Sequence, residues 1–360
     1  MTASTVPIRP LSVGEARGRF AAGRGYLAAC TLGLPSIATS AAMRADGERW
    51  ARGEACAVEY TAVVERVRSS YAALVGVDEG RVAIGSQTSA IASVIAAAVP
   101  DGAEVLCVDG DFSSIVFPFL SQSSRSVRVR HVPLHALAES MTDDTWLVAF
   151  SLVQSASGEV ADTRAILAAA RAHGTRTFCD TTQAVGWMPV DASVFDATVC
   201  HSYKWLCAPR GAAFLTISPE FAAMVAPVQT GWYAGTDPWA SCYGPLMELA
   251  ADARRFDVSP AWPVWVGAEP AIDLFRSLDH DAVRAHVTGL ATAFALGLGA
   301  DPAATDGQAI ITWPDADGSD LSRLTAAGIT ASGRRGRARV AFHVWNDEQD
   351  VADALSALGR

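Results

Sequence analysis

Lysine is almost absent from this sequence. The 360 residues include 28 lysines and arginines, and only one of them, Lys204, is a lysine. It stands within the apolar and aromatic stretch CHSYKWLCAPRGAAFL, residues 200–215. Burying an ammonium group costs several kcal/mol unless the group is paired or neutral. The position of this one lysine therefore needs a chemical explanation.

Four other absences exclude broad classes of protein. No run of about 18 uninterrupted apolar residues occurs, so we expect no membrane-spanning helix. Residues 1–20 lack a basic start followed by an apolar core, so we expect no secretion signal. The 7 cysteines include no C-x-x-C pair, which argues against a disulfide framework or a metal site and favours the cytoplasm. The net charge of −10 argues against a nucleic-acid partner, because the arginine cluster at 334–339 is too short to reverse it.

Short apolar runs alternate with helical patterns from about residue 80 onward. The clearest helix follows Asp162, which is suited to be its N-cap, and ends at Gly174. Strands separated by helices of this length predict an α/β fold, with a mostly parallel sheet and helices on both faces. The predicted strands cover 81–84, 104–109, 146–150, 175–180, 196–201 and 211–217, and another helix covers 89–99.

The C-terminal part of the sequence has a different texture. Residues 218–265 are rich in Trp, Pro and Gly and predict an irregular connection. Beyond them we predict a helical stretch at 268–298, a strand at 309–313, a helix near 320–327, a strand at 337–345 and a last helix at 346–359. The chain is therefore expected to comprise an N-terminal arm at 1–20, a large domain at 21–245 and a smaller α+β domain at 246–360.

Polar residues follow three of the predicted strands. Residues 85–88 (GSQT) lie between a strand and a helix, where backbone N–H groups and the helix dipole favour a phosphate. Asp180 ends a second strand, and Lys204 follows a third. In an open α/β sheet, ligands bind outside the carboxyl ends of the strands.

Each of these features has an ordinary interpretation when taken alone: a helix cap, a surface turn, and a lysine with its ammonium group in water. Together they are the groups that pyridoxal 5′-phosphate needs, namely a phosphate site, a carboxylate for the pyridinium nitrogen and a lysine for the Schiff base. A Schiff-base lysine requires a desolvated pocket that lowers its pKa, which explains Lys204.

The stretch CDTTQAVGWMPVDASVFDATVCHSYKWLCAPRGAAFL, residues 179–215, resembles the core of the class V aminotransferase family, a group of fold-type I pyridoxal-phosphate enzymes. The shared pattern is Asp-x-x-Gln/His, Pro-x-Asp, Ser/His-x-Lys and Pro-x-Gly. A weaker resemblance extends from about residue 25 to RARVAFHVWNDEQDV. It implies a large domain with a mostly parallel seven-stranded sheet and a smaller α+β C-terminal domain.

The resemblance also implies roles around the cofactor ring. Lys204 would form the Schiff base and move the Cα proton. Asp180 would keep the pyridine nitrogen protonated, and Gln183 would donate a hydrogen bond to the phenolic oxygen. Phe112 falls where the family places a group that stacks on the ring. Arg339 matches the arginine that binds the substrate α-carboxylate, with Arg334 or Arg335 as alternatives.

Further residues are implied at the edges of the site. Gln87 and Thr88 would bind the cofactor phosphate, helped by His201 and Tyr203. In this fold the region of Gly231 and Trp232 reaches the neighbouring subunit's active site, so the resemblance implies a homodimer with Trp232 close to the substrate.

The reaction is less defined than the cofactor. Persulfide-forming desulfuration is disfavoured, because no cysteine follows Cys242 where that reaction needs one. We expect an aminotransferase or a β-eliminating C–S lyase that acts on an α-amino acid. An amino-acid epimerase and a kynureninase-type hydrolase are alternatives, since GWYAG and SYKW resemble kynureninase and KWLCAPRGAAFL resembles isopenicillin N epimerase-like proteins. Epimerisation needs a second base, for which Tyr233, Tyr243 and His343 are candidates.

Two other classes of protein fit less well. GRGYLA at 23–28 lacks the third glycine and the preceding strand of a dinucleotide-binding motif. A non-catalytic binding protein of the same fold is the second alternative, but such a protein would be expected to lose Lys204 or Asp180, and both are present.

Overall fold

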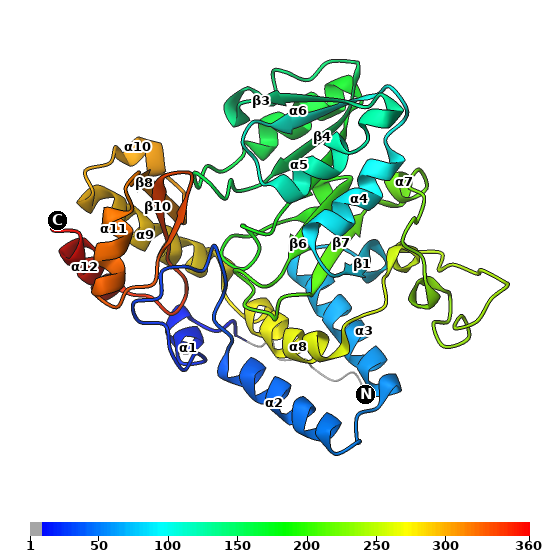
Figure 1. Ribbon diagram of the computed structural model, residues 1–360, viewed down its shortest axis with the longest axis horizontal. Helices are drawn as coiled ribbons and strands as arrows, with labels where there is room; N and C mark the ends of the chain where they lie inside the picture. Colours follow the sequence, from blue (N-terminus) through cyan, green and yellow to red (C-terminus); the bar gives the residue numbers. More distant parts are fainter. Residues whose placement is uncertain (1–8) are drawn as a thin grey trace.

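A seven-stranded sheet forms the centre of the larger part of the chain (Figure 1). The computed structural model describes residues 9–360, so the expected N-terminal arm lies partly outside the described residues. The helices are α1 Val13–Arg17, α2 Ile37–Ala51, α3 Ala57–Leu74, α4 Thr88–Ala98, α5 Ser113–Leu120, α6 Thr163–His173, α7 Pro219–Ala222, α8 Trp262–Arg276, α9 His280–Gly297, α10 Pro302–Thr305, α11 Ser319–Ala326 and α12 Glu348–Ala357. The strands are β1 Val82–Gly85, β2 Glu104–Val108, β3 Arg128–Val132, β4 Thr145–Ser151, β5 Arg176–Asp180, β6 Ala197–His201, β7 Ala213–Ile217, β8 Ile310–Pro314, β9 Ser332–Arg334 and β10 Arg337–Ala341.

The strands of this sheet follow the order β1-β7-β6-β5-β4-β2-β3. Only β7 runs antiparallel to its neighbours, and the pairs from β6 to β3 are parallel. The prediction of a mostly parallel seven-stranded sheet is therefore confirmed. Its carboxyl ends lie along one edge, which is where an open α/β sheet binds its ligands.

Both faces of the sheet are buried, as the apolar strands require. Alternate side chains such as Phe150 and Phe214 face a core that includes Tyr71 of α3 and Trp265 of α8. The intervening side chains, such as Phe178, face the second core, which is covered by α4 and α5. A parallel sheet covered on both faces leaves only its strand ends accessible to a ligand.

The N-cap and the glycine stop that the sequence predicted are both present at α6. The Asp162 carboxylate accepts a hydrogen bond from Ala165 N at 3.0 Å, and Gly174 adopts φ +67°, a conformation that glycine tolerates best. The predicted helical stretch at 268–298 is instead two helices, α8 and α9. The chain breaks between them because Asp279 caps a new helix by accepting a bond from Ala282 N.

Two further sequence predictions were incomplete. Strand β3 was not predicted, because its residues RVRHV carry charges and lie at the edge of the sheet, half exposed. The predicted strand at 337–345 ends at Ala341, where β10 leaves its partner β8.

A smaller three-stranded antiparallel sheet, in the order β8-β10-β9, carries the C-terminal part of the chain. Its core joins Phe294 of α9, Leu324 of α11 and Val351 of α12 to Val340 of β10. Residues 26–28 add to this unit through bridges to Thr330 and Ala341. In contrast, α8 packs on α2 and α3, beside the large sheet. The expected division of the chain at residue 245/246 stays a prediction.

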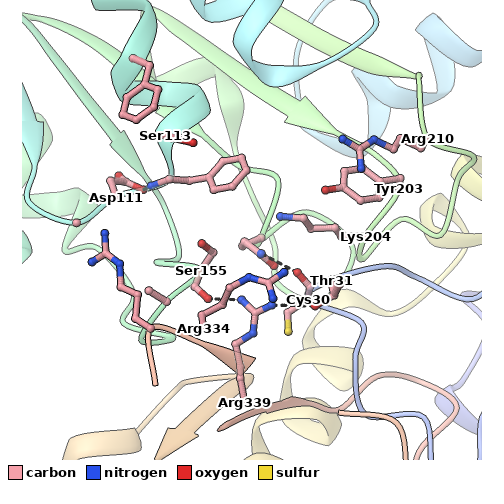
Figure 2. A pocket seen from close by; sticks show the side chains of 16 residues that line it. Cys30, Thr31, Asp111, Ser113, Ser155, Tyr203, Lys204, Arg210, Arg334 and Arg339 are labelled. Carbon is pink, nitrogen blue, oxygen red and sulfur yellow. Dashed lines mark hydrogen bonds between the residues drawn. The ribbon is translucent and has the colours of Figure 1, made fainter. Parts of the chain in front are cut away.

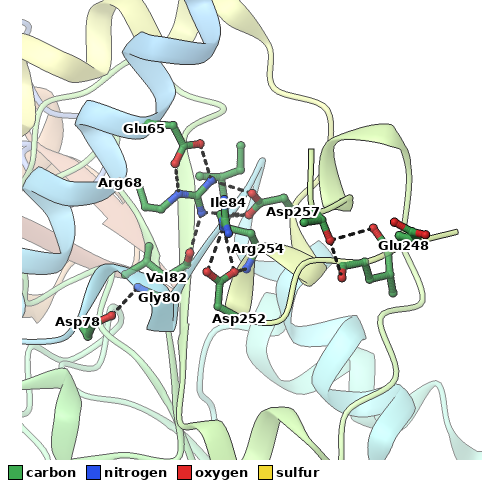
Figure 3. A network of polar contacts seen from close by, with 12 residues as sticks. Glu65, Arg68, Asp78, Gly80, Val82, Ile84, Glu248, Asp252, Arg254 and Asp257 are labelled. Atoms are coloured by element: carbon green, nitrogen blue, oxygen red, sulfur yellow. Dashed lines mark hydrogen bonds and ion pairs between the residues drawn. The ribbon is translucent and has the colours of Figure 1, made fainter. Parts of the chain in front are cut away.

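A buried ion pair fixes the chain beside β1, the strand that leads to the expected phosphate turn (Figure 3). Arg68 of α3 and Asp257 are 2% and 1% exposed, and two N–H···O bonds of 3.2 and 2.7 Å join them. Arg68 also donates to Val82 O at 2.6 Å, and Asp257 accepts from Ile84 N at 2.7 Å. The pair therefore satisfies backbone groups of β1 that no neighbouring strand reaches.

None of the helices among the described residues is both long enough and apolar enough to cross a membrane.

Candidate active site

A cavity of about 470 Å³ opens at the carboxyl ends of the large sheet (Figure 2). Turns after β2, β4, β5 and β6 contribute to its wall, as do the residues before β7, the segment near residue 30 and the β9–β10 hairpin. The lining residues are Cys30, Thr31, Gly110, Asp111, Phe112, Ser113, Phe117, Ser155, Ala156, Gln183, Tyr203, Lys204, Arg210, Arg334, Arg335 and Arg339. The cavity thus lies between the large sheet and the small one.

Lys204 lies inside this cavity and is 6% exposed. Within residues 9–360, no hydrogen bond or ion pair reaches its Nζ atom, which lies 5.3 Å from the ring centre of Phe112 and 5.6 Å from that of Tyr203. Burial lowers the pKa of Lys204 from 10.5 to about 8, although the charge of Asp180 opposes this shift. A substantial fraction of the amine is therefore neutral and nucleophilic near neutral pH.

Asp180 ends β5 and is 4% exposed. Its carboxylate accepts a hydrogen bond from Thr182 N at 2.8 Å, and in the described part of the chain it has no ion pair. Burial raises the pKa of Asp180 to about 6, although the Thr182 hydrogen bonds oppose this shift. Asp180 does not line the cavity wall, but its charge acts on Lys204. A buried carboxylate of this kind is stabilised by a cationic ligand.

Gln183 lines the cavity, and its amide is held from two sides. Its Nε2 donates to Cys30 O at 2.9 Å, and its Oε1 accepts from Trp205 Nε1 at 2.7 Å. These bonds fix the orientation of the amide and leave one of its two N–H groups for a ligand.

His201 and Tyr203 lie together beyond β6, with ring centres 4.4 Å apart. Burial lowers the pKa of His201 to about 4, with Arg210 adding repulsion. Since its Nε2 accepts from Gly211 N at 3.3 Å, the neutral ring carries its proton on Nδ1. Tyr203 lines the cavity, and the Arg210 guanidinium lies 5.1 Å from its ring centre. Arg210 was not anticipated from the sequence.

Gln87 and Thr88 lie at the start of α4, and neither lines the cavity. Gln87 is the N-cap residue but makes no side-chain cap, and Thr88 is buried. Gln229 Nε2 donates to Ala90 O at 3.2 Å, so the segment after β7 passes beside the first turn of α4. The free N–H groups of this turn suit an anion, and the phosphate role of Gln87 and Thr88 stays a prediction.

Phe112 covers one side of Lys204 and is 40% exposed. The neighbouring Asp111, for which the sequence predicted no role, fixes the backbone of Phe112. The Asp111 carboxylate accepts four hydrogen bonds, from Phe112 N at 2.6 Å, Ser151 Oγ at 2.6 Å, Ser151 N at 2.8 Å and Gln154 Nε2 at 3.1 Å. The turn after β2 is thereby tied to β4, and the Phe112 ring is held over the cavity.

Arg339 and its two sequence alternatives, Arg334 and Arg335, all line the cavity. Arg339 is 2% exposed and donates to Ser332 Oγ at 3.0 Å, Thr31 Oγ1 at 2.8 Å and Ser155 O. Figure 2 shows Arg334 and Arg339 extending from the small sheet toward Lys204. The small unit therefore places several guanidinium groups opposite the lysine.

The segment near residue 30 closes the cavity and was not identified from the sequence. Cys30 and Thr31 line the wall, and Gly33 N donates to Tyr203 O at 2.9 Å. A β-carbon on Gly33 would collide with Lys204 O, so only glycine allows the segment to approach the lysine this closely.

Four other residues named from the sequence lie away from the cavity. Trp232 contacts Tyr233 and Trp239, with ring centres 5.1 Å apart in both pairs, and does not line the wall. Tyr233 is 1% exposed within the core, and Tyr243 is 91% exposed. Both ring nitrogens of His343 have partners, since Nε2 bonds to Trp205 O and Nδ1 accepts a hydrogen bond from Val344 N. Tyr233, Tyr243 and His343 do not line the cavity of their own chain, and a role as second base stays a prediction for each of them.

The structure thus combines a covered α/β sheet with a buried lysine in a cavity at its strand ends, the edge at which folds of this class bind their ligands. Residues 40–305 match the family model "Aminotransferase class-V", and the chain belongs to this family. Membership of this family supports an enzyme of the aminotransferase or lyase type, as the sequence motif predicted.

Two curated relatives and one solved structure illustrate the similarity. The chain is 30% identical over 256 residues to a kynureninase of Deinococcus radiodurans, a match that covers 68% of this chain and only 62% of that protein. It is 25% identical over 311 residues to the uncharacterized aminotransferase YcbU of Bacillus subtilis, with 82% of each chain covered. The cystine C–S lyase C-DES, solved with cysteine persulfide, superposes with a TM-score of 0.84 at 19% identity, covering 94% of this chain and 97% of that one. This last match supports the fold alone.

Proposed function

We propose that this protein is a pyridoxal-phosphate-dependent enzyme that acts on an α-amino acid through Lys204, as an aminotransferase or a β-eliminating lyase. The observation that carries the proposal is the burial of Lys204 and Asp180 at neighbouring strand ends, each without an ion pair among the described residues. Unpaired buried charges are costly, and pyridoxal phosphate would satisfy both of them, since Lys204 would hold its aldehyde carbon and Asp180 would hold its ring nitrogen.

The surrounding groups fit the remaining parts of the cofactor. The first turn of α4, with Gln87 and Thr88, suits the phosphate. The Nδ1–H of His201, at the end of β6, is a further donor for it. The free N–H of Gln183 suits the phenolic oxygen, and the Phe112 ring suits stacking on the pyridine. Tyr203 and Arg210 complete the side near His201.

Pyridoxal phosphate, when bound, supplies a ring that withdraws electrons from the α-carbon of an amino acid. The residues of this chain then have separate tasks. Arg339 binds the substrate α-carboxylate, because two of its five N–H groups stay free after its bonds to Ser332, Thr31 and Ser155. Lys204, with its pKa lowered to about 8, holds and moves the proton of the α-carbon near neutral pH.

The uniqueness of Lys204 allows a direct test. The protein is incubated with pyridoxal phosphate, reduced with borohydride and digested, and the modified peptide is identified by mass spectrometry. We expect the label on Lys204 and its absence from Lys204→Met. Because the chain has no other lysine, the N-terminal amine is the one competing amine. Label at that amine alone, in the wild type, contradicts the proposal.

Product analysis then distinguishes the reactions. An amino acid converted to its keto acid, with the cofactor left in its amine form, indicates an aminotransferase. Pyruvate and ammonia from a cysteine conjugate indicate a β-eliminating lyase. Inverted configuration indicates an epimerase, and cleavage of kynurenine indicates the hydrolase of the similar D. radiodurans protein. Label on Lys204 without turnover of any amino acid identifies a binding protein.

The proposal includes a cytoplasmic homodimer in which the Gly231–Trp232 segment lies near the partner's cavity. Residues 236–248 project away from the small unit of their own chain (Figure 1), and Tyr243, Leu246 and Met247 are 91%, 82% and 71% exposed. Apolar side chains this exposed are typical of an interface. The 7 cysteines are free thiols, which supports a reducing compartment. Light scattering should give twice the chain mass, reduced to one chain in a Tyr243→Ser, Leu246→Ser variant.

A further inference from the structure

Positive charge gathers on the wall of the cavity. Arg210, Arg334, Arg335 and Arg339 line it, and across residues 9–360 none of them forms an ion pair. The one carboxylate in the wall, Asp111, is already satisfied by four neutral donors. A guanidinium group stays charged at any physiological pH, so this wall is built to receive anions.

Arg210 belongs to the side of the cofactor phosphate. It lies over the Tyr203 ring at 5.1 Å, and its charge contributes to the lowered pKa of His201. The hairpin arginines approach from another side, because Arg334 and Arg339 extend from the small sheet whereas Arg210 precedes β7 of the large sheet (Figure 2). The two sets of cations therefore serve different anions.

Arg339 can bind one carboxylate and no more. Three of its N–H groups donate to Ser332, Thr31 and Ser155, which leaves one on each terminal nitrogen. One N–H group on each terminal nitrogen is enough for the two bonds that one carboxylate accepts from an arginine. The α-carboxylate of an amino acid uses both of these groups.

Arg334 is left with most of its donors. Its one hydrogen bond runs from Nη1 to the adjacent Gly333 O at 2.7 Å, so four of its five N–H groups are free of protein partners. Its neighbour Arg335 is placed against the turn after β2, since a β-carbon on Gly110 would lie 2.8 Å from Arg335 Nη1. Arg334 extends toward Lys204 next to Arg339 (Figure 2), so it is the better placed of the two to form a second anion site beside the first one.

We propose that the substrate is an acidic α-amino acid, whose side-chain carboxylate binds Arg334 while its α-carboxylate binds Arg339. This inference rests on the proposed function and narrows its substrate class. The cavity of about 470 Å³ has to take the cofactor as well as the substrate.

Unreactive acids test this assignment by binding alone. The titrated protein is unreduced holoenzyme from a preparation in which a reduced sample carries the label on Lys204. It is titrated calorimetrically with glutarate and with butyrate, which differ by the second carboxylate. We expect glutarate to bind at least about tenfold more tightly, the effect of one charge-assisted bond. Arg334→Gln should abolish that preference without changing butyrate binding. Arg337→Gln is the matched control, because Arg337 lies on the same hairpin, donates to Thr312 and does not line the cavity.

Turnover gives a second readout. Wild-type enzyme should have a higher kcat/KM for glutamate or aspartate than for 2-aminobutyrate, and Arg334→Gln should reduce the ratio of these two kcat/KM values. Equal binding of glutarate and butyrate by the wild type overturns the inference, as does a preference that survives in Arg334→Gln or is lost only in Arg335→Gln. Failure of the proposed function is distinct, since it appears earlier as a missing label on Lys204.

Discussion

Lys204 should react with pyridoxal phosphate at a much lower pH than an ordinary lysine. Burial lowers its pKa from 10.5 to about 8. At about pH 7.5, a group with this pKa is roughly one quarter neutral, whereas an ordinary lysine is neutral in about one molecule per thousand. If each neutral amine is equally reactive, Lys204 gains about 200-fold in rate from its surroundings.

The assay follows attachment of pyridoxal phosphate to the apoprotein by visible absorbance between about pH 6 and pH 10. Nα-acetyl-lysine serves as the reference amine, and Lys204→Met corrects for attachment at the N-terminus. We expect the rate to rise with a midpoint near 8, and to shift upward in Arg334→Gln, which removes one of the repulsive charges. A midpoint above about 10, equal to that of the reference, refutes the reasoning.

The same shift has a consequence for stability. The unfolded lysine keeps its proton up to its ordinary pKa, so between about pH 8 and 10.5 the unfolded state binds more protons than the folded one. The apoprotein therefore gains stability from this group as the pH rises through that window, by about 3 kcal/mol in total. The free energy of unfolding of Lys204→Met should lack this gain. If the free energies of unfolding of the wild type and of Lys204→Met change with pH in the same way, the lowered pKa of Lys204 is contradicted.

Three further predictions concern the supports of the site. Asp257→Ala leaves the buried Arg68 charge with the more exposed Glu65 as its remaining ion-pair partner, so the free energy of unfolding measured in urea should fall by about 3 kcal/mol, and a loss below about 1 is inconsistent with the pair. Gly33→Ala pushes the nearby segment off Lys204, so pyridoxal phosphate attachment should slow by at least about tenfold while circular dichroism stays unchanged; an unaltered rate rejects the tight contact. Arg339→Gln should raise KM for the amino acid at least about tenfold with a smaller effect on kcat, and an unchanged KM moves the carboxylate role to Arg334 or Arg335.

Local spacing in the sequence was informative wherever the fold acts through neighbouring residues. A strand, a turn and a helix in succession place 85–88, Asp180 and Lys204 at strand ends, and parallel pairing brings those ends to one edge. The cofactor class and the family could therefore be predicted and were confirmed. The break between α8 and α9 was missed because apolar periodicity continues across it, and only the cap at Asp279 marks it.

The sequence by itself determined the sheet, the buried lysine and its carboxylate, because these depend on apolar runs and on residues a few positions away. Only the tertiary structure decided what surrounds them. Thr31, Ser155 and Arg339 meet through hydrogen bonds across separations of up to 308 residues, and no local pattern encodes that meeting. Substrate choice depends on such meetings, since an arginine such as Arg334 recognises an anion only where the packing of distant segments leaves its donors facing the cavity.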